Sequence, residues 1–311
     1  MPQTPDLSVI IVSWNVRDLL AECLESVHAS APHAEVLVVD SASSDGSAEM
    51  VRERFPWVEL IAERENVGFT RGNNIALARA RGRHLLLLNP DTVVHGDATA
   101  RMVAYLDAHP TVGIVGPRVL NADGSTQSTR RRFPTLSTAF FESTWLQGYA
   151  PRKLLERYYV LDKPDEGTFE VDWVQGCALM ARREVYEQIG GLDESYVMFS
   201  EELDWCRRAK AAGWEVVYLG EARITHYGGQ SSAQVPARKH IYFQQSKIRY
   251  FRKFHGRAAA WTLRAFLIAS YGLQLAQEAA KWAFGHKRAL RAERVRTYAH
   301  VLRALSFGGE V

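Results

Sequence analysis

The sequence predicts an α/β protein with a mostly parallel central sheet flanked by helices and followed by a C-terminal helical extension. Fully apolar runs of strand length alternate with helical patterns in the first third of the chain, an order typical of βαβ units. Three of these runs end in polar residues, and open α/β sheets bind ligands at the carboxyl ends of their strands. The chain has 311 residues, 47% hydrophobic and 23% charged, so it is a globular protein with one large core or two modest ones.

The predicted elements follow one another in that alternating order. Strands are predicted at 9–12, 36–39, 58–61, 85–88 and 112–115, and helices at 18–30, 46–55, 73–81 and 97–109. From 116 to about 170 the periodicity fades, which predicts a mobile functional loop rather than packed structure. Regular patterns return with strands at 171–181 and 214–219 and helices at 183–189 and 201–212.

Beyond Gly256 the composition shifts to alanine, leucine and arginine and predicts two or more helices up to about Ser306. We therefore divide the chain into a domain at 1–256 and a helical extension at 257–311. Arg264 and Gln274 interrupt the apolar stretch 258–276, so it does not predict a membrane-spanning helix. One interpretation packs an amphipathic helix on the first domain. The other rests it on a membrane through four aromatic anchors, Trp261, Phe266, Tyr271 and Trp282.

Charge and cysteine content narrow the class of partner. The net charge of +3 does not indicate a nucleic-acid partner. Basic residues do collect at 130–132 and from Arg238 onward, where an anionic lipid or a phosphate could bind. Cys23, Cys177 and Cys206 form neither a metal-type pair nor a disulfide framework, which fits a reducing compartment. The first residues lack the features of an export signal, so a cytoplasmic protein is expected.

Two loops near the start of the chain could bind a nucleotide. Asp40 ends an apolar run, and a carboxylate fixed there can accept hydrogen bonds from a nucleobase or a ribose. Asp45 and Ser47, just after it, are more simply explained as turn and helix caps. The segment 66–74 places two glycines and three asparagines ahead of a predicted helix. Its backbone amides could approach a phosphate closely, or its last two asparagines could merely cap the helix.

Asp91 is the best candidate for a divalent cation site. It follows the run 85–88 and Asn89-Pro90, and Mg²⁺ or Mn²⁺ commonly uses one or two protein carboxylates beside phosphate oxygens. The alternative is a strand-end turn in which Asn89 and Asp91 bond only to the backbone. His226, in a glycine-rich context after a predicted strand, could be an imidazole ligand of the same cation or a packed histidine.

Acidic residues cluster at the start of the helix predicted at 201–212. Glu201, Glu202 and Asp204 there would favour the helix dipole, so N-terminal capping is one explanation. A general base that deprotonates an acceptor hydroxyl is the other. Glu202 and Asp204 cannot point the same way, so one faces the acceptor and another orients Arg207 or Arg208.

These motifs resemble the family 2 glycosyltransferases of the GT-A fold, and more narrowly their bacterial rhamnosyltransferase-like branch. The resemblance runs from Leu7 to about Gly256. It rests on the ordered motifs Val12-Ser13-Trp14-Asn15, Val38-Val39-Asp40, Ser44-Asp45-Gly46-Ser47, Asn66-Val67-Gly68-Phe69, Gly72-Asn73-Asn74, Asn89-Pro90-Asp91, Trp173-Val174-Gln175-Gly176, Glu201-Glu202-Leu203-Asp204 and His226. Asn89 replaces the first aspartate of the family's DXD motif, which leaves Asp91 as the sole carboxylate ligand.

The resemblance implies an inverting glycosyltransferase that uses Mg²⁺ or Mn²⁺, with Asp91 and His226 as metal ligands. It implies Glu202 as the base, with Glu201 as the alternative because a glutamate stands where the family usually has aspartate. The arginine-rich segment from Arg130 is similar to the family's mobile lid. Donor-binding residues would be Ser13, Trp14, Asn15, Asp40, Asn66, Gly68, Phe69, Asn73, Asn74 and Asn89. Acceptor-binding residues would be Trp173, Gly176 and Asp204.

The family analogy suggests dTDP-rhamnose or a UDP-hexose as donor. The acceptor would be a saccharide or a polyprenyl-diphosphate-linked saccharide of a cell-surface polysaccharide, reached at the cytoplasmic face of the membrane. Two other classes stay open. A nucleotidyltransferase would need a glycine-rich phosphate loop with a basic residue after the first strand. Ser13-Trp14-Asn15, at that position, does not resemble such a loop. A non-catalytic nucleotide-sugar binding protein would lack the base or the metal residue.

Overall fold

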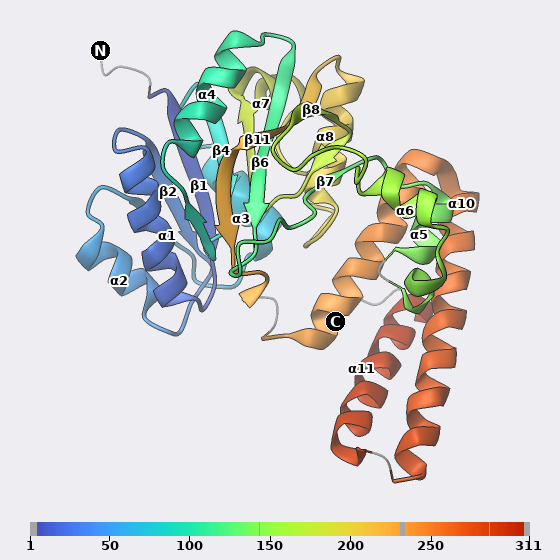
Figure 1. Ribbon diagram of the computed structural model, residues 1–311. Coiled ribbons are helices and arrows are strands. Elements are labelled where there is room, and N and C mark those ends of the chain that lie inside the picture. The colour runs from blue at the N-terminus through green and yellow to red at the C-terminus, as the bar shows by residue number, and fades with distance from the viewer. Residues whose placement is uncertain (1–4, 143, 231–233, 286, 308–311) are drawn as a thin grey trace. The chain divides into compact units, whose positions relative to one another are not determined.

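The computed structural model describes residues 5–142, 144–230, 234–285 and 287–307 (Figure 1). The chain divides into two compact units. The first holds residues 1–133, 151–197 and 201–231, and the second holds 134–150, 198–200 and 232–311. The domain division at residue 256 stays a prediction.

The first unit is built on a mixed nine-stranded sheet. Its order is β3-β2-β1-β4-β10-β6-β11-β5, with β8 paired to β11. The strands from β3 to β4 are mutually parallel, and β10 runs antiparallel between β4 and β6. The bounds are β1 Leu7–Ser13, β2 Glu35–Asp40, β3 Glu59–Ala62, β4 His84–Leu88, β5 Thr92–Val94, β6 Val112–Leu120, β8 Thr168–Val171, β10 Ala178–Arg182 and β11 Glu215–His226. The predicted α/β class is confirmed.

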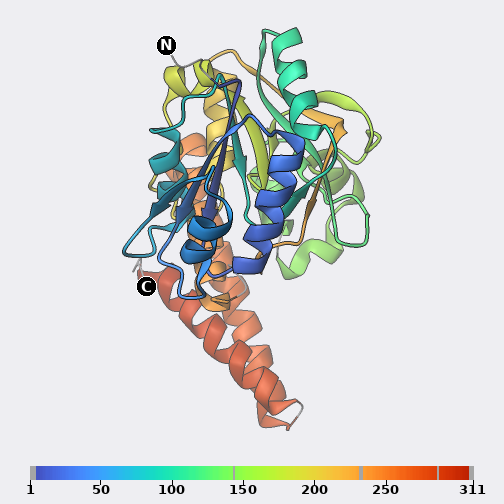
Figure 2. The same cartoon turned by 90° about the vertical axis from the view of Figure 1, so that its left-hand side faces the viewer.

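Helices cover both faces of this sheet because its strands are apolar at nearly every position. One face packs against buried residues of α1, α2 and α4, such as Leu24, Met50 and Met102. Figure 2, turned by 90°, shows α1 running along the sheet. The opposite face meets α3, α7 and α8. The bounds are α1 Arg17–Ser30, α2 Ser47–Arg54, α3 Gly68–Leu77, α4 Ala98–Ala108, α6 Arg152–Tyr158, α7 Arg183–Ile189 and α8 Glu201–Ala211.

The segment 116–170 differs from the prediction of a structureless loop. It continues β6 to Leu120 and contains β7 (Arg130–Arg131), α5 (Leu136–Phe141), the 3₁₀ helix η1 (Trp145–Tyr149) and α6. β7 pairs with β9 (Trp173–Val174) in a small second sheet. Arg130 and Arg131 are therefore buried strand residues rather than part of a mobile lid. Helix α3 also begins earlier than predicted, at Gly68, so residues 68–74 of the glycine and asparagine segment are themselves helical.

The second unit contains α5, η1, α10 (Pro236–Ala283) and α11 (Arg288–Phe307). α10 and α11 run side by side as a helical hairpin (Figure 1). Gly256, with φ 87° and ψ 173°, breaks the helical path of α10. Two proposed membrane anchors are engaged within this unit, because the half-buried Phe266 packs on Phe140 and Tyr271 is buried against Tyr298. Within the described residues, no helix is both long and apolar enough to cross a membrane.

Candidate active site

The carboxyl ends of β1 and β2 bring two predicted donor residues together. Ser13 and Asp40 are register partners on these neighbouring strands. Both are buried, and within the described part of the chain neither Ser13 Oγ nor Asp40 Oδ1 has a hydrogen-bond partner. The other Asp40 oxygen accepts a hydrogen bond from Ser43 N at 3.0 Å. Buried polar atoms normally have hydrogen-bond partners. A polar ligand bound beside Ser13 and Asp40 would supply the partners that these two atoms lack.

Asn15 ties the two loops that follow these strands. Its backbone has φ 52°, a left-handed conformation that asparagine tolerates better than most residues. Its Oδ1 accepts a hydrogen bond from Ser44 N at 2.7 Å, and Asp45 Oδ2 accepts one from Arg17 N at 2.9 Å. Asp45 Oδ1 also accepts from Ser47 N at 3.1 Å. Asp45 therefore holds the turn as the sequence predicts, but the N-cap position of α2 is Gly46, which has no side-chain cap. Trp14, beside Asn15, is half-buried.

The segment at 66–74 is held by its own asparagines. Asn66 Oδ1 accepts hydrogen bonds from Ser41 Oγ at 3.1 Å and from Gly68 N at 3.0 Å. Gly68 has φ +75°, which an L side chain rarely adopts, and Phe69 beside it is half-buried. The two asparagines inside α3 serve the fold instead. Asn73 Nδ2 donates to Phe69 O at 2.9 Å, and Asn74 Nδ2 donates to Leu192 O at 2.8 Å.

Asn89, Asp91 and His226 meet beyond the end of β4, as the sequence predicts. His226 Nε2 lies 3.3 Å from both Asp91 Oδ1 and Asn89 Nδ2. Asp91 Oδ2 accepts a hydrogen bond from Gln230 N at 3.3 Å. Burial alone would raise the pKa of Asp91, but its hydrogen bond with His226 holds that pKa below the usual range. Burial likewise opposes protonation of His226, while the bonds to Asp91 and Cys177 raise its pKa to about 10.

These residues fit a divalent cation. Adjacent ligands of an octahedral Mg²⁺ lie about 3 Å apart, close to the separation of His226 Nε2 and Asp91 Oδ1. Asn89 Oδ1 is buried and, within the described chain, lacks a hydrogen-bond partner. The described residues contain no cluster of three or more His, Cys, Asp or Glu side chains suited to a metal. A cation there would therefore need ligands from a bound diphosphate or water, as is usual for Mg²⁺.

Gln127 orients the imidazole of His226, and sequence reasoning missed it. Its Nε2 donates to the His226 carbonyl at 2.6 Å, so its Oε1, 3.1 Å from His226 Nδ1, accepts from that ring nitrogen. Because the pKa of His226 is raised to about 10, both ring nitrogens carry protons at neutral pH, and Nε2 donates to Asp91. A bound cation would take the place of the Nε2 proton, while Gln127 keeps the proton on Nδ1. Gln127 lies in the aperiodic segment, where no pattern distinguished it from a solvated loop residue.

Glu201 and Glu202 open α8 in two different environments. Glu201 is 4% exposed, and burial together with the Glu202 charge raises its pKa well above the ordinary value. Burial also raises the pKa of Glu202, while a hydrogen bond from the Gly176 backbone and the charge of Arg131 oppose that rise. Gly176 lies directly beside this side chain, since a Cβ there would be in van der Waals contact with Glu202 Cβ, at 3.4 Å. Within the described residues Glu202 Oε2 is buried without a hydrogen-bond partner.

The remaining predicted acceptor residues lie close to this base but differ in what they contact. Asp204 is fully buried, and its Oδ2 lies 2.6 Å from Arg208 Nε, so this carboxylate is engaged within the fold. Trp173 Nε1 donates to Arg132 O at 2.9 Å. The Arg131 guanidinium lies over the Trp173 and Tyr159 rings, 5.9 and 4.5 Å from their centroids. Arg131 is thus a second residue near the site that the sequence assigned to a mobile lid.

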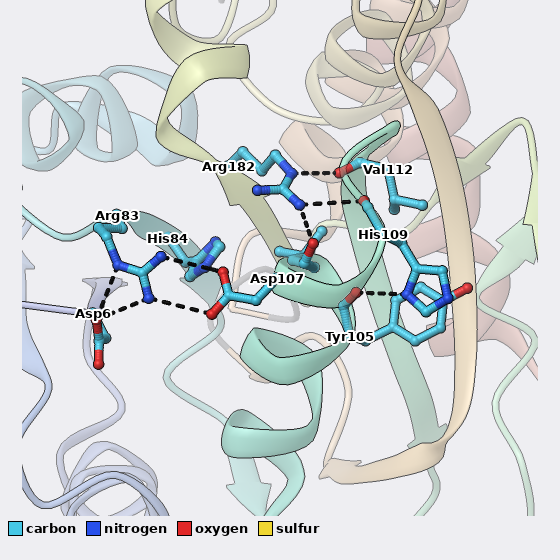
Figure 3. Close-up of polar contacts among 9 residues, drawn as sticks. Asp6, Arg83, His84, Tyr105, Asp107, His109, Val112 and Arg182 are labelled. Carbon is cyan, nitrogen blue, oxygen red and sulfur yellow. Dashed lines mark hydrogen bonds and ion pairs between the residues drawn. The ribbon is translucent and has the colours of Figure 1, made fainter.

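A separate cluster of titratable residues lies at the opposite, amino edge of the sheet (Figure 3). Arg83 contacts Asp6 and Asp107, and His84 Nε2 lies 2.9 Å from Asp107 Oδ1. Arg182 donates to the carbonyls of Leu106, His109 and Val112 and so holds the end of α4. The charges in this cluster are paired with one another, which makes it a structural network.

Comparison with known proteins identifies the family to which the chain belongs. The model of glycosyl transferase family 2 matches residues 8–190, more than half of the chain. The N-acetylglucosaminyl-diphospho-decaprenol L-rhamnosyltransferase of Mycobacterium tuberculosis is 26% identical over 280 residues, which cover 85% of this chain and 91% of that protein. Rhamnosyltransferase WbbL of Escherichia coli is 24% identical over 259 residues, covering 79% of this chain and 92% of that protein.

Solved structures show the same fold. A mannosyltransferase from Pyrobaculum calidifontis in complex with GDP-Man and Mn²⁺ has a TM-score of 0.58 and 19% identity, covering 99% of this chain and 89% of that one. TarS of S. aureus has a TM-score of 0.52 and 16% identity, covering 98% of this chain and 92% of that one. The predicted GT-A fold and enzyme class are confirmed. The chain is a glycosyltransferase that belongs to family 2 and is similar to bacterial rhamnosyltransferases.

Proposed function

We propose that this enzyme is an inverting, metal-dependent glycosyltransferase that moves a sugar from a nucleoside diphosphate sugar to an acceptor hydroxyl. The observation that supports it best is a row of buried polar atoms without partners among the described residues: Ser13 Oγ, Asp40 Oδ1, Asn89 Oδ1 and Glu202 Oε2. Strand register brings the first three to the carboxyl edge of β1, β2 and β4. Glu202 joins them through Gly176, which precedes the antiparallel β10.

The donor would lie along this edge. Asp40 and Ser13 would accept and donate hydrogen bonds to the nucleoside, with Trp14, Asn15 and Asn66 shaping the pocket. Gly68 and Phe69 would line its wall, while Asn73 and Asn74 would support that wall through their bonds inside the fold. Asp91 and His226, with Asn89 beside them, would hold Mg²⁺ or Mn²⁺. When bound, such a cation supplies charge neutralisation for the leaving diphosphate.

Glu202 would act as the base. The acceptor oxygen forms a bond to the anomeric carbon while the bond to the diphosphate breaks, so the configuration inverts in one displacement. The acceptor proton passes to the Glu202 carboxylate. Burial raises the pKa of Glu202, but the Gly176 amide and the Arg131 charge oppose that rise and favour the ionised form, which a base requires. Glu201 lacks both contacts and suits a neutral neighbour, although it stays the alternative base.

The donor sugar and the acceptor are proposed from the relatives. Two of them are rhamnosyltransferases, and one is named for a decaprenol-linked acceptor. We therefore propose dTDP-rhamnose or a UDP-hexose as donor and a saccharide or polyprenyl-diphosphate-linked saccharide as acceptor. Trp173 and Gly176 would line the acceptor pocket. The reaction would take place in the cytoplasm at the inner face of the membrane, in the synthesis of a cell-surface polysaccharide.

A donor panel tests this function. Nucleotide release and thermal stability are measured with UDP-, GDP- and dTDP-sugars, in Mn²⁺, in Mg²⁺ and in EDTA. Release with one donor that stops in EDTA is the expected result. Equal release in EDTA would refute the metal role. Stabilisation by a donor without any transfer, tested with lipid-linked acceptors present, would favour a binding protein over an enzyme.

A further inference from the structure

Charge is distributed unevenly along the chain in a way that the sugar-transfer site does not explain. Nine of the 38 lysines and arginines, and none of the 35 acidic residues, lie between Ala222 and Gln277. Most of this acid-free stretch is α10. A stretch of this length without a single carboxylate has a local excess of positive charge, although Lys247 pairs with Glu142 from another segment. Such an excess attracts anionic ligands.

A hollow on α10 gathers three of these arginines. It has a volume of about 370 Å³ and is lined by Ile248, Arg252, Arg257, Ala260, Trp261 and Arg264. Gly256 breaks the helix between Arg252 and Arg257, and its φ of 87° is one that glycine adopts without strain. These two arginines make no hydrogen bond or ion pair with any residue that the structure describes. Two unpaired guanidinium groups in one hollow are suited to bidentate binding of a phosphate.

The third arginine is fixed in place. Arg264 Nε donates to Leu305 O at 2.6 Å and its Nη2 donates to Ser306 O at 3.2 Å, so α11 holds its guanidinium. The same group lies 5.2 Å from the centre of the Trp261 ring. Arg264 therefore gives the hollow a rigid cationic wall, whereas Arg252 and Arg257 are free to close on a ligand.

Exposed aromatic side chains on the same hairpin point to a membrane surface as the source of that phosphate. Trp261 at the hollow is 64% exposed, Trp282 is 47% exposed and Phe284 is 90% exposed. Arg288 lies 5.9 Å from the Trp282 ring centre. Tryptophan and arginine together are typical of segments that rest in the lipid headgroup region, whereas a site for a free anion needs no exposed aromatic rings.

We propose that the hollow formed by Arg252, Arg257, Trp261 and Arg264 binds the phosphate of an anionic phospholipid headgroup. This inference rests on the proposed function, because a lipid-binding site is useful to the enzyme if its acceptor is linked to a lipid. It replaces the interpretation with four aromatic anchors, since Phe266 is half-buried against Phe140 and Tyr271 is buried against Tyr298. A bound headgroup would keep the enzyme at the surface where such an acceptor is found.

Vesicle sedimentation tests this proposal without donor or acceptor, so its outcome is independent of the transfer reaction. The full chain is mixed with phosphatidylglycerol vesicles or phosphatidylcholine vesicles at fixed ionic strength. We expect binding to the anionic vesicles only, and about a tenfold or greater loss of affinity in Arg252→Gln/Arg257→Gln. Arg52→Gln/Arg54→Gln, which removes two exposed arginines of α2, is the matched control and should bind normally.

Three results would overturn the proposal. One is equal binding of the wild type to both kinds of vesicle. Another is unchanged affinity of the Arg252→Gln/Arg257→Gln variant. The third is calorimetric binding of inorganic phosphate that depends on both arginines in a protein that fails to sediment with vesicles, which would identify a free anion as the ligand. Nucleotide release from the donor, measured on the same variants, should stay at the wild-type level.

Discussion

The residues Glu201 and Glu202 are neighbours in sequence, and burial raises the pKa of both carboxyl groups, yet their surroundings oppose that rise differently. Glu201 is buried beside a like charge, which favours its neutral form, whereas Glu202 receives the Gly176 amide and faces the Arg131 charge. The chain enters α8 through Phe199 and Ser200, whose φ values of 69° and 66° are strained for non-glycine residues. Such strain is typical of functional sites. One methylene of side-chain length is thus less decisive here than the surroundings of each carboxylate.

This contrast predicts different outcomes for two conservative substitutions. Glu202→Gln should lower kcat by about 100-fold or more, because a glutamine cannot accept the acceptor proton. Glu201→Gln should keep most of the activity, because it replaces a neutral acid with a neutral amide. Sugar transfer under saturating donor measures both, and circular dichroism checks that both fold. The reverse ranking would move the base to Glu201.

Gln127 offers a test of the proposed metal site that leaves its proposed ligands, Asp91 and His226, in place. Gln127→Ala removes the hydrogen bond that orients His226 and should weaken Mn²⁺ affinity by about 10-fold to 100-fold. Turnover measured against Mn²⁺ concentration gives this shift, with kcat at saturating Mn²⁺ largely retained. An exposed glutamine of α10, Gln277→Ala, is the control. An unchanged Mn²⁺ curve would show that His226 does not depend on Gln127.

At the scale of elements, the position of α8 depends on Arg208, which pairs with Asp204 on the same helix. Arg208 also donates to the carbonyls of Ile189 and Gly191, which joins α8 to the end of α7. Asp204→Ala would leave the Arg208 cation half-buried without its carboxylate. We expect a loss of about 3 kcal/mol in the free energy of unfolding, measured by urea denaturation. An unchanged stability with a raised acceptor KM would instead return Asp204 to the acceptor site.

The amino edge of the sheet gives a prediction for pH. Burial lowers the pKa of His84 in the folded protein, and the hydrogen bond with Asp107 only partly offsets it. Below about pH 6.5, the ordinary pKa of histidine, the unfolded chain therefore binds the proton more readily, and stability falls with falling pH. Urea unfolding between pH 7.5 and 5.5 should show a smaller fall in His84→Gln. Parallel curves would show that His84 contributes nothing to acid sensitivity.

Helices and strands were predicted correctly where a single segment carries a clear hydrophobic pattern of its own. The strands at 9–12 and 85–88 are fully apolar, and the residues that follow them, such as Ser13 and Asp91, were placed correctly at one edge of the sheet. The prediction for the segment 116–170 was wrong because its elements are short and pair with residues distant in sequence, as β7 does with β9. Arg130 and Arg131 look like solvated charges in sequence. In the structure they are buried among aromatic rings, which only tertiary packing determines.

At the scale of the whole molecule, binding and stability are linked through the polar atoms that lack partners. Donor with Mn²⁺, at about 100 times its dissociation constant, should stabilise the folded protein by about 2.7 kcal/mol. Ser13→Ala removes a buried hydroxyl without a partner among the described residues. It should raise the melting temperature of the free protein and reduce the shift caused by the donor. Differential scanning fluorimetry measures both, and a lower melting temperature of the free variant would contradict this assignment.

The row of unpartnered atoms also has a consequence for anyone who redesigns this enzyme. A stability-guided search would replace Ser13, Asp40 and Asn89 early, because each one has a buried polar atom with no hydrogen-bond partner among the residues that the structure describes. The resulting variants would have higher melting temperatures but lower affinity for the donor. Natural selection on transfer rate and laboratory selection on heat resistance should therefore diverge first at these three positions.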